Sequence, residues 1–182
     1  MKLLLHFLIL GQVGLISLMA VSTNANRCED IHVEGTGTNP WVTIPGVSRF
    51  CYAYSSTPFT WEAANQHCKS LSSPGNEEGD LTSLDNPEEA SAMFNYWSNA
   101  GTNLESGYWI GLNRGDVTGQ TRRWTDYSRL RINDQAWQEG EPTNNCAYVA
   151  NEGATDEEKM KWKTASCSTV TKPFICERKN YL

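Results

Sequence analysis

Six cysteines limit the folds open to this chain more than any other feature. They are spread over most of its length: Cys28, Cys51, Cys68, Cys146, Cys167 and Cys176. An even number of cysteines in an exported chain is typical of a disulfide framework, although spacing alone does not choose among the many pairings. A zinc site is the alternative, but the sequence has no CxxC pair, and His32 and His67 are far apart. We therefore expect three disulfides.

The beginning of the chain predicts that it is exported. Lys2 is followed by an apolar run and then by small residues, which is the layout of a secretory signal peptide. We predict that residues 1–25 form this peptide, with cleavage after Ala25 and Ser22 as the alternative. No later stretch approaches the roughly 18 consecutive apolar residues of a spanning helix. We expect a secreted, extracellular protein without membrane insertion.

Charge and residue pattern exclude several classes of function. The net charge is −6 and the basic residues are scattered, so nucleic acids and anionic membranes are poor partners. No serine or cysteine has a histidine partner motif nearby, and acidic pairs are too common on an acidic surface to indicate a glycosidase. We predict that the protein is not an enzyme; its oligomeric state stays open.

Two helices are predicted in the first half. The first begins after Thr60, which can cap it. Its apolar residues recur at three- and four-residue steps and share one face: Trp61, Ala64, Cys68 and Leu71. The second begins after Asn86, another capping residue, with Pro87 in its first position. Its predicted buried stripe consists of Ala90, Met93, Phe94 and Trp97.

Short strands and irregular segments make up the rest. FCYAYSS (50–56) alternates with period two, and YWIGL (108–112) is apolar enough to be buried on both faces. Three further strands are predicted in CAYVA, MKWKTASC and PFICER. We expect irregular backbone at 27–46, a long loop from 113 to 145, and a solvated turn at DEEK. Two helices followed by short strands predict an α+β fold with an antiparallel sheet.

Six stretches together resemble the C-type lectin-like domain family: TWEAANQHC, YWIGL, RRWTDYS, AWQEGEPTNNCAYV, WKTASC and PFICER. They follow the family's order and approximate spacing from about Phe50 to Arg178. The resemblance implies a disulfide-stapled fold in which two helices flank antiparallel sheets and a long loop region projects from one end. We therefore divide the chain into the signal peptide 1–25, an N-terminal segment 26–49 tethered by Cys28, and a C-type lectin-like domain 50–182.

The resemblance also implies a disulfide pairing. Cys68 is expected to bond Cys176, and Cys146 to bond Cys167. Cys28 and Cys51 are expected to form the additional N-terminal pair of longer family members. The first of these bonds would join the two ends of the domain.

Sugar-binding members of the family hold a calcium ion that coordinates sugar hydroxyls directly. Their ligands come from a Glu-Pro-Asn tripeptide, a glutamate two residues before the next cysteine, and a Trp-Asn-Asp tripeptide. The matching positions of this chain are Glu141, Thr143, Asn144, Lys163 and Thr164, so only the first glutamate is kept. Calcium requires six to eight oxygen ligands with enough carboxylate to balance its charge.

We therefore expect a degenerate sugar and calcium site, with calcium disfavoured and no other cofactor. Lys163 could pair with Glu141 and replace the ion; the alternative is a solvated lysine on a strand. Asp116, Asp126, Asp134 and Glu139 remain in the long loop as conceivable ligands of an auxiliary calcium ion.

These observations lead to two functional hypotheses. The first is a secreted recognition module that binds an extracellular glycan or protein through its long-loop face without calcium at the usual sugar site. The second is a calcium-dependent carbohydrate-binding lectin, of mannose-type preference because Glu141 is a glutamate rather than a glutamine.

Overall fold

The computed structural model describes residues 28, 41–71, 79–84, 86–114, 121–131, 133 and 135–179. The predicted signal peptide lies outside the described residues, and the division into segments 26–49 and 50–182 stays a prediction. Helices and strands follow one another in this order: β1 (Val42–Ile44), β2 (Val47–Thr60), α1 (Trp61–Ser70), β3 (Asp80–Leu81), α2 (Pro87–Asn99), β4 (Tyr108–Asn113), β5 (Arg123–Trp124), β6 (Cys146–Val149), α3 (Asp156–Lys159), β7 (Trp162–Ala165) and β8 (Thr171–Lys179).

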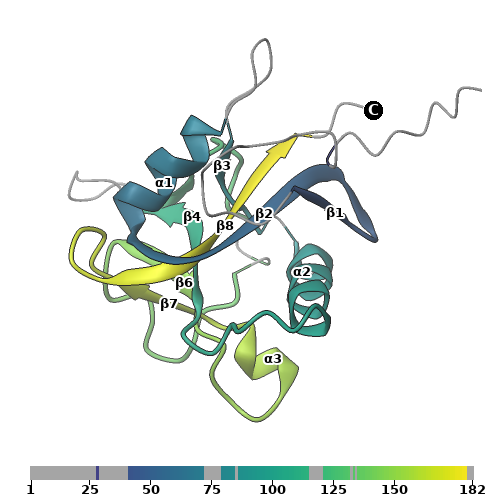
Figure 1. Ribbon diagram of the computed structural model, residues 1–182. Helices are drawn as coiled ribbons and strands as arrows, with labels where there is room; N and C mark the ends of the chain where they lie inside the picture. The colour runs from purple at the N-terminus through teal and green to yellow at the C-terminus, as the bar shows by residue number, and fades with distance from the viewer. Residues whose placement is uncertain are drawn as a thin grey trace, which may run out of the picture.

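The strands form one mixed sheet. Its main path runs β1-β2-β8-β4-β6-β7, while β3 pairs with β8 and β5 with β4. All pairs are antiparallel except β4 and β8, which run parallel where Trp109 faces Phe174. Helices α1 and α2 lie on opposite sides of the long β2–β8 pair, and α3 lies at the end where β7 begins (Figure 1). The predicted α+β fold is confirmed, with this one parallel pair added to the antiparallel sheet.

Both long helices begin at the predicted caps. The Thr60 side chain accepts a hydrogen bond from the backbone N–H of Ala63 (3.2 Å), and the Asn86 side chain accepts one from the N–H of Glu89 (2.8 Å). The predicted stripe of α2 is buried except for Ala90, which is only half-buried. Glu89 is buried instead, because its carboxylate accepts a hydrogen bond from the Tyr52 hydroxyl (2.6 Å).

Period-two alternation in the strands builds two separate hydrophobic clusters. Alternate residues of β2 and β4 enter the cluster that α2 covers: Tyr52, Tyr54, Tyr108, Ile110 and Leu112. The residues between them enter the cluster that α1 covers: Cys51, Ala53 and Trp109. Successive side chains of a strand point to opposite faces, so one apolar strand can serve both clusters. YWIGL is buried on both faces for this reason, as predicted.

Gly111 of β4 shows how tightly the strands pack. A Cβ atom at this position would lie 2.5 Å from the carbonyl oxygen of Leu81 and 2.5 Å from the hydroxyl of Thr125. The Gly111 N–H donates to the carbonyl of Thr82 (2.8 Å), which holds β4 against the segment after β3. A larger residue would therefore separate two parts of the fold.

The three predicted disulfides are confirmed. Cys68 of α1 bonds Cys176 of β8, with a sequence separation of 108. Cys146 of β6 bonds Cys167, and Cys28 bonds Cys51 of β2. No free cysteine remains.

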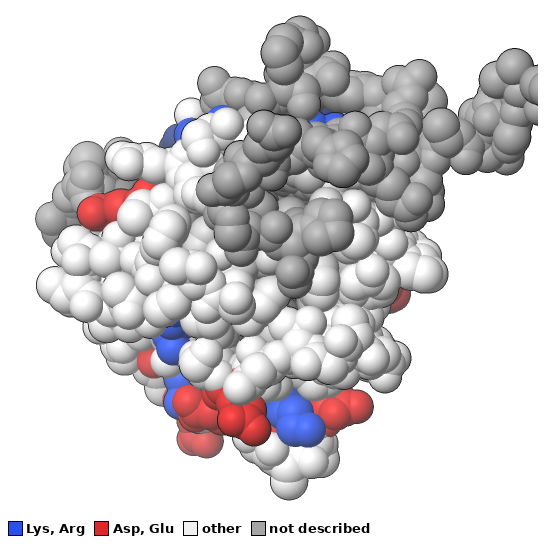
Figure 2. Space-filling model, in the orientation of Figure 1, with Lys and Arg blue, Asp and Glu red and all other residues white. Residues whose placement is uncertain are grey.

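Three expectations about irregular segments were wrong. The expected long loop 113–145 contains the strand β5, which pairs with β4 where Trp124 lies opposite Leu112. Part of segment 27–46 forms strand β1, which pairs with β2 and lies beside the buried Trp41. DEEK forms the short helix α3 rather than a turn, because Thr155 and Glu158 make a reciprocal capping box. Acidic and basic side chains gather around α3, while most of the described surface in the same view is uncharged (Figure 2). Among the described residues, no helix is long and apolar enough to cross a membrane.

Candidate functional site

The pairing of β6 with β7 brings the predicted site residues together. Thr143 and Asn144 lie just before β6, while Lys163 and Thr164 lie in β7 opposite Tyr148 and Ala147. Glu141 lies in the preceding loop, joined to Pro142 by a cis peptide bond. Residues separated by about twenty positions in the sequence thus share one small surface.

The hydroxyl of Thr164 is the centre of a hydrogen-bond network. It accepts from the backbone N–H groups of Thr143 (2.9 Å) and Asn144 (2.7 Å) and donates to the Glu141 carboxylate. The same carboxylate oxygen, Oε2, accepts from the N–H groups of Thr143 (2.9 Å) and Thr164 (3.2 Å). Thr164 is 7% exposed. The retained glutamate is therefore engaged by neighbouring residues of the same chain.

This network also controls the charge of Glu141. Partial desolvation acts to raise the pKa of its carboxyl, but the hydrogen bonds from Thr164 and Thr143 together outweigh it and lower the pKa. Hydrogen bonds to the ionised form of a carboxyl favour that form. Glu141 is consequently an anion at neutral pH, with its charge directed at threonine hydroxyl and backbone N–H groups.

Lys163 does not pair with Glu141, and that hypothesis was wrong. Its ammonium lies 2.5 Å from the carboxylate of Glu152, in the loop before α3. The hydrogen bond to Glu152 is the main cause of its raised pKa. The register of β7 explains the choice, since Lys163 pairs across the strands with Tyr148 and Thr164 pairs with Ala147. Neighbouring residues of a strand point to opposite faces, so Thr164 rather than Lys163 faces Glu141.

Arg122 is a member of the site that the sequence did not indicate. Its guanidinium donates to the backbone carbonyls of Asn145 (3.2 Å) and Asn144 (2.6 Å) and lies 5.4 Å from the centre of the Trp137 ring. Desolvation is the main cause of its lowered pKa, with repulsion from Arg114 adding to it and attraction by Glu141 opposing it. Arg122 therefore ties the segment before β5 to the segment before β6.

Trp162, the first residue of WKTASC, is part of the core. It is 1% exposed and makes edge-to-face contacts with Trp124 (5.7 Å between ring centres) and Trp137 (5.4 Å). Its backbone N–H donates to the carbonyl of Ala136 (2.7 Å), which attaches the long loop to β7. Trp162 therefore packs in the core beneath the site residues of β7 and does not contact solvent.

The four residues expected as auxiliary calcium ligands are Asp116, Asp126, Asp134 and Glu139. Asp116 and Asp134 lie outside the described residues. The carboxylate of Asp126 accepts a hydrogen bond from the backbone N–H of Ser128, two residues along the chain (2.9 Å). Within the ranges that the structure describes, no three histidine, cysteine, aspartate or glutamate side chains are grouped so that they could hold a metal ion.

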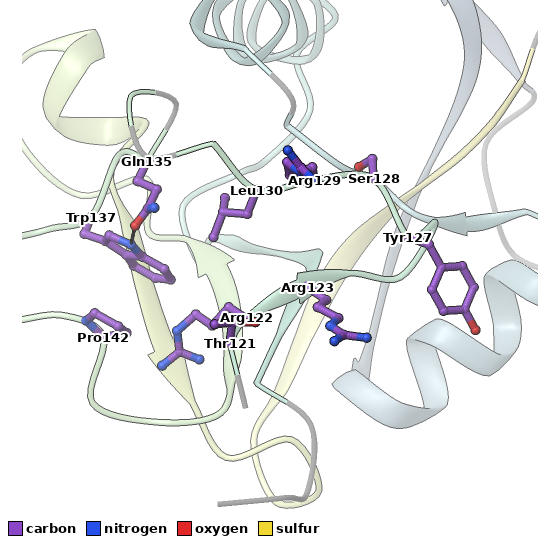
Figure 3. A pocket seen from close by; sticks show the side chains of 10 residues that line it. All are labelled: Thr121, Arg122, Arg123, Tyr127, Ser128, Arg129, Leu130, Gln135, Trp137 and Pro142. Carbon is purple, nitrogen blue, oxygen red and sulfur yellow. Dashed lines mark hydrogen bonds between the residues drawn. The ribbon is translucent and has the colours of Figure 1, made fainter. Parts of the chain in front are cut away.

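A groove of about 690 Å³ opens beside this network. Figure 3 shows side chains from the segments 121–123 and 127–130 together with those of Trp137 and Pro142. Three of its lining residues are arginines: Arg122, Arg123 and Arg129. Residue spacing does not indicate that these arginines share a groove, because the loop that contains them lacks periodicity.

Comparison with known proteins identifies one family. Residues 57–178 match the Lectin C-type domain. The Alpha-N-acetylgalactosamine-specific lectin of Patiria pectinifera is 31% identical over 131 residues, which cover 70% of this chain and 73% of that protein. The Low affinity immunoglobulin epsilon Fc receptor of Homo sapiens is 27% identical over 143 residues, which cover 76% of this chain but only 37% of the receptor. The crystal structure of C-type lectin CEL-I from Cucumaria echinata superposes with a TM-score of 0.62 and 26% identity, covering 78% of this chain and 96% of that one.

Proposed function

The chain belongs to the C-type lectin domain family, and on that premise we propose that it is a secreted, non-enzymatic recognition module. It binds an extracellular glycan or protein through its long-loop face, without calcium at the position of the family's usual sugar site. Its relatives are lectins and receptors rather than enzymes, which supports the recognition role.

The engagement of Glu141 by Thr164 carries the proposal. Four N–H or O–H groups of the same chain already donate to Oε2 of this carboxylate: the backbone N–H groups and the side-chain hydroxyls of Thr143 and Thr164. A calcium ion at this position would have to compete with each of them. This observation supports a loop that is stable as it is, with no ion required.

The charge around the site supports the same conclusion. Glu141 is the one carboxylate among the five matched positions, whereas calcium sites balance the ion with several. The two nearby cations already have partners within the chain. Arg122 donates hydrogen bonds to the carbonyls of Asn144 and Asn145, and Lys163 forms an ion pair with Glu152. These residues do not fit the donor set of a divalent cation.

The calcium-dependent lectin remains the second hypothesis, since Glu141 is retained. The Patiria pectinifera relative is named for α-N-acetylgalactosamine, so both this sugar and mannose belong in the test. The decisive experiment is a glycan array, run with the secreted protein in calcium and again in EDTA. Any glycan signal is expected to be the same in both conditions. A signal that EDTA abolishes would establish the calcium-dependent lectin instead.

Thermal melting provides an independent test of the same proposal. Calcium that binds the folded state raises the melting temperature. We expect melting temperatures in calcium and in EDTA to agree within about 1 °C. A calcium-dependent rise with a midpoint in the low millimolar range or below would contradict the proposal.

A further inference from the structure

We propose that the groove beside Glu141 binds a sulfated glycan, with sulfate groups on its arginines and a sugar ring on Tyr127. This inference rests on the proposed function, because it names the ligand class for the long-loop face. It concerns a set of six residues: Arg122, Arg123, Arg129, Tyr127, Trp137 and Pro142.

The positive charge of the groove is the first argument. Arg123 and Arg129 are exposed, and neither forms an ion pair with any described residue. No aspartate or glutamate is among the described residues that line the groove. The whole chain nevertheless has a net charge of −6, so three arginines in one groove are a local reversal of sign. Such a concentration of charge attracts an anionic ligand.

The three arginines also differ in the contacts that their guanidinium groups make within the protein. Arg122 is held by the carbonyls of Asn144 and Asn145 and by the Trp137 ring, so it contributes a fixed charge. Arg123 and Arg129 keep their guanidinium donors available to a ligand. A planar guanidinium donates two parallel hydrogen bonds to a tetrahedral oxyanion or a carboxylate, which gives both affinity and orientation.

Tyr127 is the second argument. Its side chain is 85% exposed, and its backbone has a φ of 63°, a left-handed conformation that costs free energy for a residue other than glycine. The turn is held by the Tyr127 N–H, which donates to the carbonyl of Trp124 (3.1 Å). An aromatic ring kept in water by a strained turn contributes nothing to the core. It is well suited to pack against the apolar face of a sugar ring, with its hydroxyl still in solvent.

Size favours a saccharide over a larger partner. A groove of about 690 Å³ lies in the range of sites for small ligands and could take a short stretch of an oligosaccharide. Figure 3 shows Trp137 beside Arg122 at one end of the groove and Tyr127 at the other end, with Arg123 between them, so one ligand could contact aromatic and cationic side chains together. A polymer of sulfated sugars combines both chemistries in each repeat.

The test compares dextran sulfate with dextran, which have the same sugar backbone with and without sulfate. Binding to the immobilised protein is measured in EDTA by surface plasmon resonance. We expect dextran sulfate to bind, dextran not to bind, and the affinity for dextran sulfate to fall as salt is raised. Failure of dextran sulfate to bind would overturn the inference. Glycan or protein binding by the same sample in EDTA would then leave the proposed function standing.

Variants locate the site. The double variant Arg123→Gln/Arg129→Gln is expected to bind dextran sulfate about tenfold more weakly. Arg49→Gln, which removes an exposed arginine of β2 outside the groove, is the charge control and should change affinity less than twofold. Equal weakening by the control would overturn the groove as the site. Unchanged melting temperatures establish that each variant is folded.

Two further measurements define the ligand class. Tyr127→Asn, which suits the left-handed turn but lacks the ring, is expected to weaken binding several-fold without lowering the melting temperature. Hyaluronan, which carries carboxylates but no sulfate, should bind more weakly than dextran sulfate. Equally tight binding of hyaluronan would overturn the assignment to sulfate. Equally tight binding of a single-stranded DNA would overturn the assignment to glycans.

Discussion

At the scale of single residues, the side-chain hydroxyl of Thr164 connects the residues of the site by hydrogen bonds. One hydroxyl joins the Glu141 carboxylate to the backbone of Thr143 and Asn144, and so links β7 to the loop before β6. The site residues are therefore held by hydrogen bonds within the chain. The conformation of the loop before β6 therefore depends on the Thr164 hydroxyl, which a single substitution can remove.

Thr164→Val tests that dependence, because it replaces the hydroxyl by a methyl group of nearly the same size. The variant leaves the N–H of Asn144 without its acceptor and removes one donor from the Glu141 carboxylate, so we expect a loss of about 1–3 kcal/mol in the free energy of unfolding. The measurement is urea unfolding at neutral pH. Thr169→Val, at an exposed threonine, is the control and should change stability by less than about 0.5 kcal/mol. A Thr164→Val variant as stable as this control would show that the network contributes nothing.

Glu177 of β8 is a buried acid that no functional expectation had included. It is 2% exposed and accepts hydrogen bonds from the hydroxyls of Thr82 (3.1 Å) and Ser83 (2.7 Å). Desolvation, reinforced by the nearby charges of Glu89 and Asp126, raises its pKa well above the ordinary value, although the hydrogen bonds from Ser83 oppose the rise. The residue therefore keeps its proton in the folded state at pH values where the unfolded chain has lost it.

The raised pKa of Glu177 predicts a pH dependence of stability. Above the unfolded-state pKa of about 4.3, the folded state binds more protons than the unfolded state, so stability falls as pH rises towards the folded-state pKa. Glu177→Gln removes this titration. We expect the unfolding free energy of the variant, relative to the natural protein, to be about 1 kcal/mol or more higher at pH 8 than at pH 5.

Chemical unfolding at the two pH values measures this difference. Glu88→Gln, at an exposed glutamate of α2, is the matched control. If the two variants changed with pH by the same amount, the buried acid could not be the cause.

At the scale of elements, the pairing of β6 with β7 and the short helix α3 shape the loop face. The register of β7 alternates Lys163 and Thr164 between two faces, which sends the lysine to Glu152 and the threonine to Glu141. Helix α3 follows the loop that contains Glu152, and the capping box of Thr155 and Glu158 stabilises the start of this helix. The carboxylate of Glu158 accepts from the N–H groups of Ala154 (2.8 Å) and Thr155 (3.0 Å).

Thr155→Ala tests the cap of α3. The substitution removes the Thr155 hydroxyl that accepts a hydrogen bond from the Glu158 N–H (3.2 Å). We therefore expect the free energy of local opening of the helix to fall by about 1 kcal/mol. Hydrogen exchange of the Glu158 amide should become about fivefold faster, because a change of 1.4 kcal/mol corresponds to a factor of ten. Amides of β4 in the same sample should keep their rates. Unchanged exchange at Glu158 would mean that the cap does not hold the helix.

At the scale of the whole molecule, the bond between Cys68 and Cys176 joins α1 to β8. Both cysteines are fully buried in the cluster that α1 covers, and their sequence separation is 108. The bond between Cys146 and Cys167 has a separation of only 21. In the chain-entropy account, the longer closed loop removes more freedom from the unfolded chain.

Removing each bond separately tests this ordering. We expect Cys68→Ala/Cys176→Ala to lower the free energy of unfolding by about 2–5 kcal/mol. The loss should exceed that of the matched variant Cys146→Ala/Cys167→Ala by about 1 kcal/mol or more, because the longer loop is released and both cysteines are fully buried. Guanidinium unfolding measures both variants. A larger loss for the second variant would contradict the ordering.

Local signals explain how much of the fold could be predicted. Thr60 and Asn86 are capping residues beside periodic apolar faces, so both long helices could be placed from neighbouring residues alone. The capping box of α3 is present in the sequence as Thr155 and Glu158, but the four charged residues of DEEK have no apolar periodicity that would indicate a helix. The strand at Val42–Ile44 has no such local signal, because it is stabilised by pairing with β2.

The sequence by itself determined the two long helices and five of the strands, those in FCYAYSS, YWIGL, CAYVA, MKWKTASC and PFICER, and it alone predicts a degenerate calcium site. These features depend on residue type and on spacing between close neighbours. The tertiary structure alone decided that Thr164 binds Glu141, that Lys163 pairs with Glu152, and that Arg122, Arg123 and Arg129 share one groove with Tyr127. Strand register and loop packing choose those partners through space, across separations that residue spacing along the chain does not encode.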